Sequence, residues 1–374
     1  MAHARSRCTA PARTSTLQRL ALLALLALLP ASATVHARWG LADSLCGGAH
    51  ELRALAVSGL HGAGDIASNI ALRLSPSPAF DGADASWLLV KPSRLAVVTG
   101  ANAGHGLAIS QLLAQRGVHV VMAVRSIEKG RVAAQHVHRT ASGDVCVQVL
   151  QLDLTSPASV SAFCRKLGRR RVDLVVANAG IMATPHHLTA DGLEEQWAAN
   201  FVGHYSLCRQ LWPRLADDGR VLLLSSVAHF GGYRPREPEL LAADCSGPAQ
   251  YDAYKAYKRS KWALACLAPE LQRRLATGAQ SVCAVHPGLI DTDLAFGFFR
   301  RYLPVPILRP MQRALLRSPI AAAASVLSAL ALPGAAGAYA VNGRVQKADR
   351  LIRNSPEARE WLWLIAASHA GLCP

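Results

Sequence analysis

The chain has 374 residues, of which 51% are hydrophobic, and it carries a formal net charge of +16 at pH 7. That much apolar sequence can bury a sizeable core, and the basic balance suits anionic partners such as a phosphate-bearing cofactor or an anionic membrane surface. The sequence has no zinc-ligand spacing and no basic motif interleaved with aromatic residues, so we expect neither a bound metal nor a nucleic-acid partner.

The cysteines indicate buried thiols rather than a disulfide framework. Nine are scattered along the chain without a C-x-x-C pair. Four are expected to be buried: Cys146 and Cys283 in apolar runs typical of strands, and Cys208 and Cys266 in helical patterns. Cys46 and Cys373 lie outside the regular core and could pair with each other if the protein is lumenal.

A targeting segment is expected over residues 1–37. Several arginines precede the apolar run Leu20–Leu29, and Pro30 and small residues follow it, as is typical of a secretory signal. The run is shorter than the roughly 20 residues that span a bilayer, so a cleaved signal is favoured over a retained anchor. We therefore expect a protein of the secretory pathway that associates with the endoplasmic reticulum membrane, the alternative being secretion after cleavage.

A regular α/β pattern begins at Arg94, after an unassigned connector over residues 38–90. Six apolar runs, separated by helical stretches, predict buried strands: Leu95–Val98, Val118–Val124, Val145–Leu152, Val172–Ala177, Val221–Leu224 and Val282–Val285. Thr155-Ser156-Pro157 offers a hydroxyl cap followed by proline and predicts a helix start. Residues 91–374 are thus predicted to form one domain, a doubly wound parallel sheet of the Rossmann type.

The segment RLAVVTGANAGHG, residues 94–106, predicts a cofactor site. It runs from the first strand through Gly100, Gly104 and Gly106 into a helix. Glycines let the backbone approach a pyrophosphate, whose charge is met by the amides of a helix N-terminus. The pattern therefore predicts a dinucleotide site, with a tight structural turn as the alternative.

The end of the second strand bears on the choice of cofactor. Sites for NAD usually place an acidic residue about 20 positions past the glycines, whereas the segment VVMAVRS places Arg125 there. A guanidinium can bind a 2′-phosphate, so NADP(H) is favoured over NAD(H). The alternative is a solvated surface arginine, partly neutralised by Glu128.

The segment YDAYKAYKRSKWALA contains the same pair, tyrosine and lysine four residues apart, three times: Tyr251–Lys255, Tyr254–Lys258 and Tyr257–Lys261. On a helix such side chains share one face, and an ammonium beside a phenol lowers the tyrosine pKa. Only the face that starts at Tyr257 and Lys261 continues into apolar positions, Leu264 and Ala268, as expected for a helix with one end at a site. The first two pairs are predicted to lie in solvent at or before the helix start.

Together these motifs resemble the short-chain dehydrogenase/reductase family, over roughly residues 94–345. The motif T-G-x-x-x-G-x-G is followed in order by the adenine-side acid, N-A-G, the helix asparagine, the serine strand, Y-x-x-S-K and P-G-x-x-x-T. These fall on Thr99 to Gly106, Asp153, Asn178-Ala179-Gly180, Asn200, Ser226, Tyr257 to Lys261, and Pro287-Gly288 to Thr292.

The resemblance implies a role for each motif. Tyr257 would be the general acid/base, and Lys261 would lower its pKa and hold the nicotinamide ribose. Ser226 would bind the reacting oxygen (Ser225 being the alternative), and Asn200 would hold a water linked to Lys261. The implied cofactor-binding residues are Thr99, Gly100, Asn102, Gly104, His105, Gly106, Arg125, Asp153, Leu154, Asn178, Ala179, Gly180, Tyr257, Lys261, Pro287, Gly288 and Thr292.

The sequence departs from the family pattern at three positions. His105 replaces an apolar residue between two glycines, and Ala177 replaces an asparagine that often precedes N-A-G. Pro269 follows the lysine in the same helix and is expected to interrupt and kink it.

The substrate is expected to be lipophilic. The segments DGLEEQWAANFVGHYSL and AVHPGLIDTDL resemble the retinol-dehydrogenase-like branch, which acts on lipid alcohols and aldehydes, including long polyprenoids. A loop rich in aromatic residues and arginines, Leu294–Leu316, suits an apolar pocket at a membrane surface, or a lid that merely packs on the domain.

We therefore predict an NAD(P)-dependent oxidoreductase that interconverts an alcohol and an aldehyde or ketone. The alternative is a non-catalytic dinucleotide-binding scaffold, and a homo-oligomer is left open.

Overall fold

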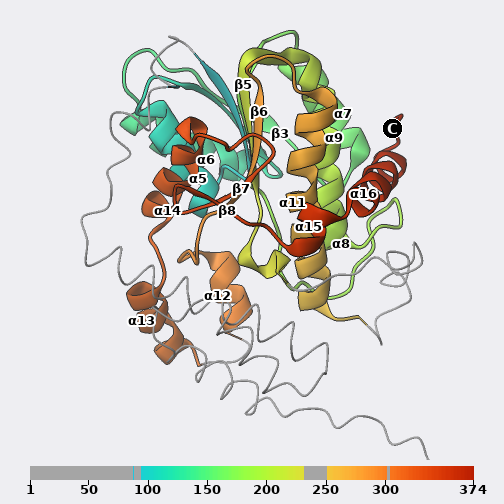
Figure 1. Ribbon diagram of the computed structural model, residues 1–374. Coiled ribbons are helices and arrows are strands. Elements are labelled where there is room, and N and C mark those ends of the chain that lie inside the picture. The colour runs from blue at the N-terminus through green and yellow to red at the C-terminus, as the bar shows by residue number, and fades with distance from the viewer. Residues whose placement is uncertain (1–86, 88–93, 231–250, 301–303) are drawn as a thin grey trace, which may run out of the picture. The chain divides into compact units, whose positions relative to one another are not determined.

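The computed structural model describes Trp87 and residues 94–230, 251–300 and 304–374. The chain divides into two units, Met1–Ala67 and Ser68–Pro374, and every described residue belongs to the second. The second unit is built on one eight-stranded sheet with the order β3-β2-β1-β4-β5-β6-β7-β8 (Figure 1). All neighbouring strands are parallel except β7 and β8, which are antiparallel.

The strands follow the apolar runs of the sequence. Their bounds are β1 Leu95–Thr99, β2 His119–Val124, β3 Val147–Gln151, β4 Val172–Ala177, β5 Leu215–Leu224, β6 Ser281–His286, β7 Tyr339–Val341 and β8 Arg344–Gln346. All six predicted strands are therefore confirmed, and the doubly wound α/β prediction is correct. The prediction missed β7 and β8, and it started β5 too late.

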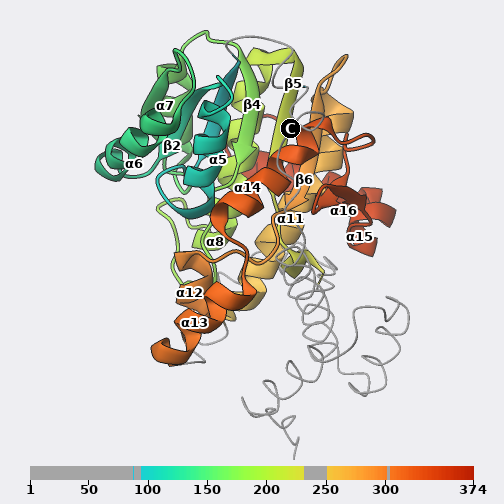
Figure 2. The same ribbon diagram turned by 90° about the vertical axis from the view of Figure 1, so that its left-hand side faces the viewer.

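Helices cover both faces of the sheet. On one face lie α5 Gly104–Ala114, α6 Ile127–Thr140 and α14 Pro319–Leu327, and Figure 2 shows α5 and α14 in front of the strands. On the other face lie α7 Pro157–Leu167, α9 Gly203–Leu211, α11 Ala253–Leu275 and α16 Pro356–His369. The other α-helices of the described ranges are α8 Glu195–Trp197, α12 Asp293–Phe299, α13 Val305–Leu315 and α15 Arg350–Asn354.

Alternation along the strands divides the core into two layers. In β1, Val97 faces α7, α9 and α11, whereas Ala96 and Val98 face α5 and α14. Both layers are apolar, so the central strands are buried on both sides. The polar residues of the motifs lie at the carboxyl ends of the strands.

Three local predictions need correction or comment. Helix α7 begins at Pro157 with the Ser156 hydroxyl accepting from Ser159 N, as predicted. Pro269 does not interrupt α11, which continues through it to Leu275. The segment predicted as a lid loop contains two helices instead, α12 and α13.

Of the thiols, Cys208, Cys266 and Cys283 are buried as predicted, but Cys146 is exposed because it precedes β3 rather than lying in it. Cys46, the predicted leader over residues 1–37, and the connector apart from Trp87 lie outside the described residues. None of the helices in the described ranges is long and apolar enough to span a bilayer.

Arg94 is fully buried at the amino-terminal edge of the sheet. Its guanidinium bonds Asp173 at 3.2 Å and Asp218 at 2.7 Å, and it lies 3.9 Å above the Trp87 ring. The Trp87 indole also donates to the backbone oxygen of Asp218. These contacts pair the buried cation with two carboxylates and tie Trp87 to the sheet.

Candidate active site

The glycine turn between β1 and α5 is built for close backbone approach. Gly100 and Gly104 adopt positive φ values of 65° and 51°, which glycine adopts at low cost. A Cβ atom on Gly106 would lie 2.6 Å from Asn178 Nδ2 and closer still to the Gly100 carbonyl oxygen. The turn is therefore packed directly against the N-A-G segment at the end of β4.

The other motif turns meet at the same edge of the sheet. A Cβ atom on Gly104 would lie 3.3 Å from Thr292 Cγ2, so the turn after β6 borders the glycine turn. A Cβ atom on Gly180 would lie 3.2 Å from Asn200 Oδ1 and 3.3 Å from Lys261 Nζ. Glycines thus occupy the positions where side chains would fill the cradle, and the residues present fit a dinucleotide.

Thr99 fastens the N-A-G segment to β1. Its buried hydroxyl oxygen accepts from the backbone N–H groups of Asn178 and Ala179, each at 2.9 Å. Asn178 Nδ2 donates to the Thr99 carbonyl oxygen. His105 Nδ1 bonds Asn178 Oδ1 at 2.9 Å, and burial lowers the pKa of His105 to about 4. The unusual histidine therefore packs as a neutral ring against the segment it faces.

Tyr257 and Ser226 meet between α11 and the end of β5. The Tyr257 side chain is buried, and its phenol lies within hydrogen-bonding reach of the Ser226 hydroxyl. Lys261 Nζ donates to the Leu224 carbonyl oxygen at 2.8 Å and lies 5.9 Å from the Tyr257 ring centroid. The neighbouring Ser225 turns the other way, because its hydroxyl donates to the Lys261 backbone oxygen. Ser226 thus faces the phenol, and Ser225 anchors the helix.

Burial dominates the ionisation of this pair. Burial raises the pKa of Tyr257 to about 12, and the Ser226 hydroxyl offsets only part of that rise. Burial also lowers the pKa of Lys261 to about 8. The tyrosine pKa lowered by lysine, expected from the sequence, is therefore not found, because desolvation of the phenol dominates.

The other two tyrosines have different surroundings. The Tyr251 hydroxyl donates to Glu194 at 2.7 Å and accepts from Gln196. This side chain is partly buried, contrary to the prediction that it lies in solvent. Tyr254 stacks on Tyr257 with ring centroids 6.2 Å apart. Of the three, the structure brings only Tyr257 to the serine.

Asn200 occupies a π-helical turn, Ala198–Val202, between α8 and α9. Its Oδ1 accepts from the Ile181 N–H, and its Nδ2 donates to the Ile181 carbonyl oxygen and to Ser260 Oγ, all at 2.9 Å. Turns of this type recur at functional sites because they redirect a side chain out of the regular helical ladder. Here the turn locks the asparagine between the N-A-G loop and α11.

The residues predicted for the adenine side lie farther along the same edge. Asp153 accepts from the Thr155 amide and hydroxyl, and the Leu154 carbonyl oxygen packs against Gly203. The Arg125 side chain is exposed at the end of β2, and no ion pair in the described part of the chain joins it to Glu128. Asn102 is half-buried in the glycine turn.

Two buried residues at the site were not predicted. His204 bonds Thr99 and the Asn200 backbone. Arg317 donates to the Pro287 carbonyl oxygen and to Asn342 Oδ1, and so braces the turn that includes Gly288 and leads to Thr292. Neither carries a sequence signal, because their partners are mostly backbone atoms or lie far away in the chain.

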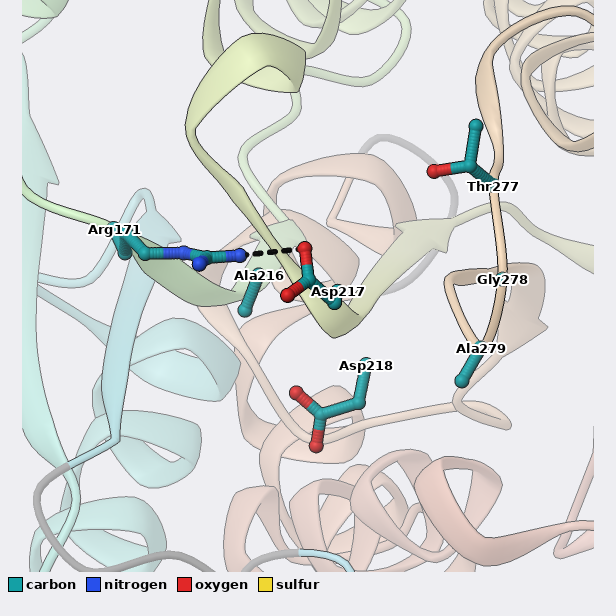
Figure 3. A pocket seen from close by; sticks show the side chains of 7 residues that line it. All are labelled: Arg171, Ala216, Asp217, Asp218, Thr277, Gly278 and Ala279. Atoms are coloured by element: carbon teal, nitrogen blue, oxygen red, sulfur yellow. Dashed lines mark hydrogen bonds and ion pairs between the residues drawn. The ribbon is translucent and has the colours of Figure 1, made fainter.

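A separate cavity of about 430 Å³ lies at the opposite edge of the sheet (Figure 3). Arg171 and Asp217 form an ion pair there, and Asp218, Thr277 and Ala279 also line it. It contains none of the motif residues. Within the described ranges, no three metal-ligating side chains are arranged to hold a metal ion.

The doubly wound sheet and its glycine cradle define a dinucleotide-binding protein. The short chain dehydrogenase family model matches residues 94–236. The chain is 34% identical over 291 residues to retinol dehydrogenase 13 of Mus musculus, covering 75% of this chain and 85% of that protein. It is 31% identical over 272 residues to polyprenol dehydrogenase of Danio rerio, covering 69% of this chain and 81% of that protein.

Solved structures agree on the fold. An uncharacterized protein from Mycobacterium paratuberculosis aligns with a TM-score of 0.59 and 33% identity, over 75% of this chain and 96% of that one. The chain belongs to the short-chain dehydrogenase family. It is therefore an alcohol-acting oxidoreductase, and its fold implies a nicotinamide dinucleotide cofactor.

Proposed function

We propose that the protein interconverts a lipophilic alcohol, of the retinoid or polyprenoid kind, and its aldehyde or ketone by hydride transfer with NADP(H). This proposal rests on the position of Tyr257: its buried phenol lies beside Ser226 and Lys261, next to the glycine cradle. Relatives named retinol dehydrogenase and polyprenol dehydrogenase support the substrate class.

Each site residue has its own role in the proposed reaction. Tyr257 donates its phenolic proton to the carbonyl oxygen during reduction and accepts one from the alcohol during oxidation. Ser226 hydrogen-bonds the same oxygen and orients it. Lys261 and Thr292 hold the nicotinamide end of the cofactor, which when bound supplies or accepts the hydride. Asn200 holds Ile181 and Ser260 in place and positions a water that returns protons to Lys261.

The cofactor proposal includes the remaining edge residues. The pyrophosphate is held by the glycine turn, and the adenine side by Asp153 and Leu154. The further members are Thr99, Gly100, Asn102, Gly104, His105, Gly106, Asn178, Ala179, Gly180, Pro287 and Gly288. The exposed guanidinium of Arg125 has no acidic partner among the described ion pairs, which leaves it available to a 2′-phosphate.

Arg125→Ala should weaken NADPH binding far more than NADH binding. Losing one charge-assisted contact costs about 1.5–3 kcal/mol, or roughly 10- to 150-fold in affinity. Titration of both cofactors into the purified variant measures this, with Arg131→Ala on the exposed side of α6 as a control for general charge loss. An equal loss for NADPH and NADH would show that Arg125 does not contact the phosphate.

The direct test of the proposed function is turnover. Purified protein should oxidise NADPH in the presence of all-trans-retinal, and more slowly with a short water-soluble aldehyde. A dinucleotide-binding scaffold, the alternative function, would bind NADPH yet show no turnover with either aldehyde. The scaffold function is disfavoured because all four proposed catalytic residues are present: Asn200, Ser226, Tyr257 and Lys261. A non-catalytic protein is not expected to retain all of them.

The rate of reduction should fall as pH rises through about 8. Lys261 is cationic below its pKa of about 8 and neutral above it, whereas Tyr257, with a pKa of about 12, keeps its proton throughout. The rate of reduction should therefore be lost above the Lys261 pKa and not below it. A kcat profile from about pH 6 to pH 10 measures it. Lys258→Gln, which removes the ammonium above the Tyr254 ring, should retain the same alkaline limb; a flat wild-type profile would contradict the assignment.

We extend the proposal to a membrane surface, where the leader and the lid each contribute a partial anchor. On α12 and α13, Leu294 and Val305 are exposed, and Arg309 lies 3.9 Å above the Phe296 ring. Exposed apolar residues with interspersed arginines suit partial insertion between anionic headgroups. A long apolar substrate would then enter beneath the lid from the bilayer.

Leu294→Ser with Val305→Ser should weaken binding to phosphatidylserine vesicles, measured by co-sedimentation, by roughly 30-fold or more, because each buried aliphatic side chain contributes about 1 kcal/mol or more. Activity on retinal should fall and activity on a short aldehyde should stay. Val132→Ser, an equally exposed valine on α6, is the matched control. Equal loss on both aldehydes would point to a folding defect and overturn the lipid-entry proposal.

A further inference from the structure

His204 is a fully buried histidine with two polar contacts on opposite sides of its ring. On one side, Nδ1 lies 2.9 Å from the backbone oxygen of Asn200. On the other side, Nε2 lies 3.0 Å from Thr99 Oγ1. The ring therefore spans the gap between the π-helical turn and the end of β1.

The partners fix the tautomer of this ring. A carbonyl oxygen can only accept, so Nδ1 carries the hydrogen and donates to Asn200. Burial lowers the pKa of His204 to about 4, so the ring is neutral in ordinary buffers and Nε2 has a free lone pair. The Thr99 hydroxyl donates to that lone pair, since its other acceptor, the Val176 oxygen, lies farther away at 3.4 Å.

This orientation leaves the Thr99 oxygen free to accept. It does so from the Asn178 and Ala179 amides, which form the N-A-G segment of the cofactor cradle. At the other end, Asn200 bonds Ile181 and Ser260, and Ser260 immediately precedes Lys261. One continuous buried network thus runs from the cradle through Thr99, His204 and Asn200 to α11.

We propose that His204 is a positioning residue: it holds the cofactor cradle through Thr99 and the catalytic asparagine through the Asn200 carbonyl, and so keeps the two in register. The proposal rests on the proposed oxidoreductase function. Buried polar networks of this kind are rigid when every member is satisfied, and costly when one partner is removed. Thr99 and His204 are both buried completely, so in the intact protein the ring and not solvent accepts from the Thr99 hydroxyl.

Two substitutions separate the two contacts. In His204→Gln the amide oxygen can reach the position of Nε2 and accept from Thr99, but the donor to Asn200 is lost. In His204→Asn the shorter amide can donate to Asn200 from the position of Nδ1, but the acceptor for Thr99 is lost. If His204 only filled space, the two variants would not differ in which quantity they change, kcat or the NADPH Kd.

The experiment measures NADPH affinity by fluorescence titration, and kcat with all-trans-retinal at saturating NADPH, on the full chain. His204→Gln should lower kcat by roughly tenfold and keep the NADPH Kd within about twofold; His204→Asn should raise the Kd by roughly tenfold and keep kcat within about twofold. Tyr205→Phe, which removes a hydrogen bond to Arg209 from the next position of α9, is the control for loss of stability.

Parallel changes of Kd and kcat in both variants, or changes no larger than those of Tyr205→Phe, would overturn the positioning role. Failure of the wild-type protein to bind NADPH or to reduce retinal would instead overturn the proposed function, and the inference with it. The wild-type measurements therefore separate the two failures.

Discussion

Tyr257→Phe should lower kcat by roughly 100- to 10,000-fold, the range over which a positioned general acid contributes to rate. The substitution removes one oxygen from a buried ring and leaves the stacking on Tyr254 in place. NADPH affinity should therefore change by less than about threefold, and the melting temperature by only a few degrees, as for the loss of one hydrogen bond. Steady-state kinetics with retinal and a cofactor titration measure both quantities.

Tyr254→Phe is the matched control, since it removes a hydroxyl from the neighbouring ring of the same helix. It should keep kcat within about twofold, because the proposed proton donor is the Tyr257 hydroxyl, which this substitution leaves in place. If Tyr254→Phe were the inactive variant and Tyr257→Phe the active one, the proposed proton donor would be wrong.

Gly106→Ala should weaken NADPH binding by roughly 10- to 100-fold. The added methyl group would lie 2.6 Å from Asn178 Nδ2 and closer still to the Gly100 carbonyl oxygen. Neither neighbour can retreat, because Asn178 is bonded to Thr99 and the Gly100 amide donates to Ala123. The turn itself must shift, and the cradle loses the shape that fits a pyrophosphate.

Gly117→Ala distinguishes this steric effect from the general cost of replacing a glycine. Gly117 has a φ of 77°, but a Cβ atom there would meet nothing within 4 Å. This control should lose about 1–2 kcal/mol of folding stability and bind NADPH normally. Normal NADPH affinity in Gly106→Ala would contradict the placement of the dinucleotide at this turn.

The burial of each strand and the charged residues within it explain which strands could be predicted. Strand β4 is buried along its whole length and Val172–Ala177 is apolar at every position except Asp173, so its bounds were predicted correctly. Strand β5 begins six residues before the predicted Val221, at Leu215, where Asp217 and Asp218 interrupt the apolar pattern. Those carboxylates bond Arg171 and Arg94, partners that no local pattern identifies. Strands β7 and β8 are short, and β8 is exposed.

The same distinction applies to the site. Local motifs identify Tyr257 and Lys261, because their spacing on one helix is visible in the sequence. The direction of the tyrosine pKa shift was predicted wrongly, since burial depends on elements far away in the chain that pack on α11, among them β5 and α8. His204 contacts Thr99 across 105 positions and Asn200 through its backbone, so neither contact leaves a pattern in the sequence.

The stacking of Arg94 on Trp87 places the physical start of the catalytic unit ahead of its first strand. With the indole removed, a buried guanidinium would lose the surface that covers it, and its ion pairs with Asp173 and Asp218 would become more exposed to water. A truncated chain that starts at Leu95 therefore loses the cation of this ion-pair network, and one that starts just after Trp87 loses the ring that covers the cation.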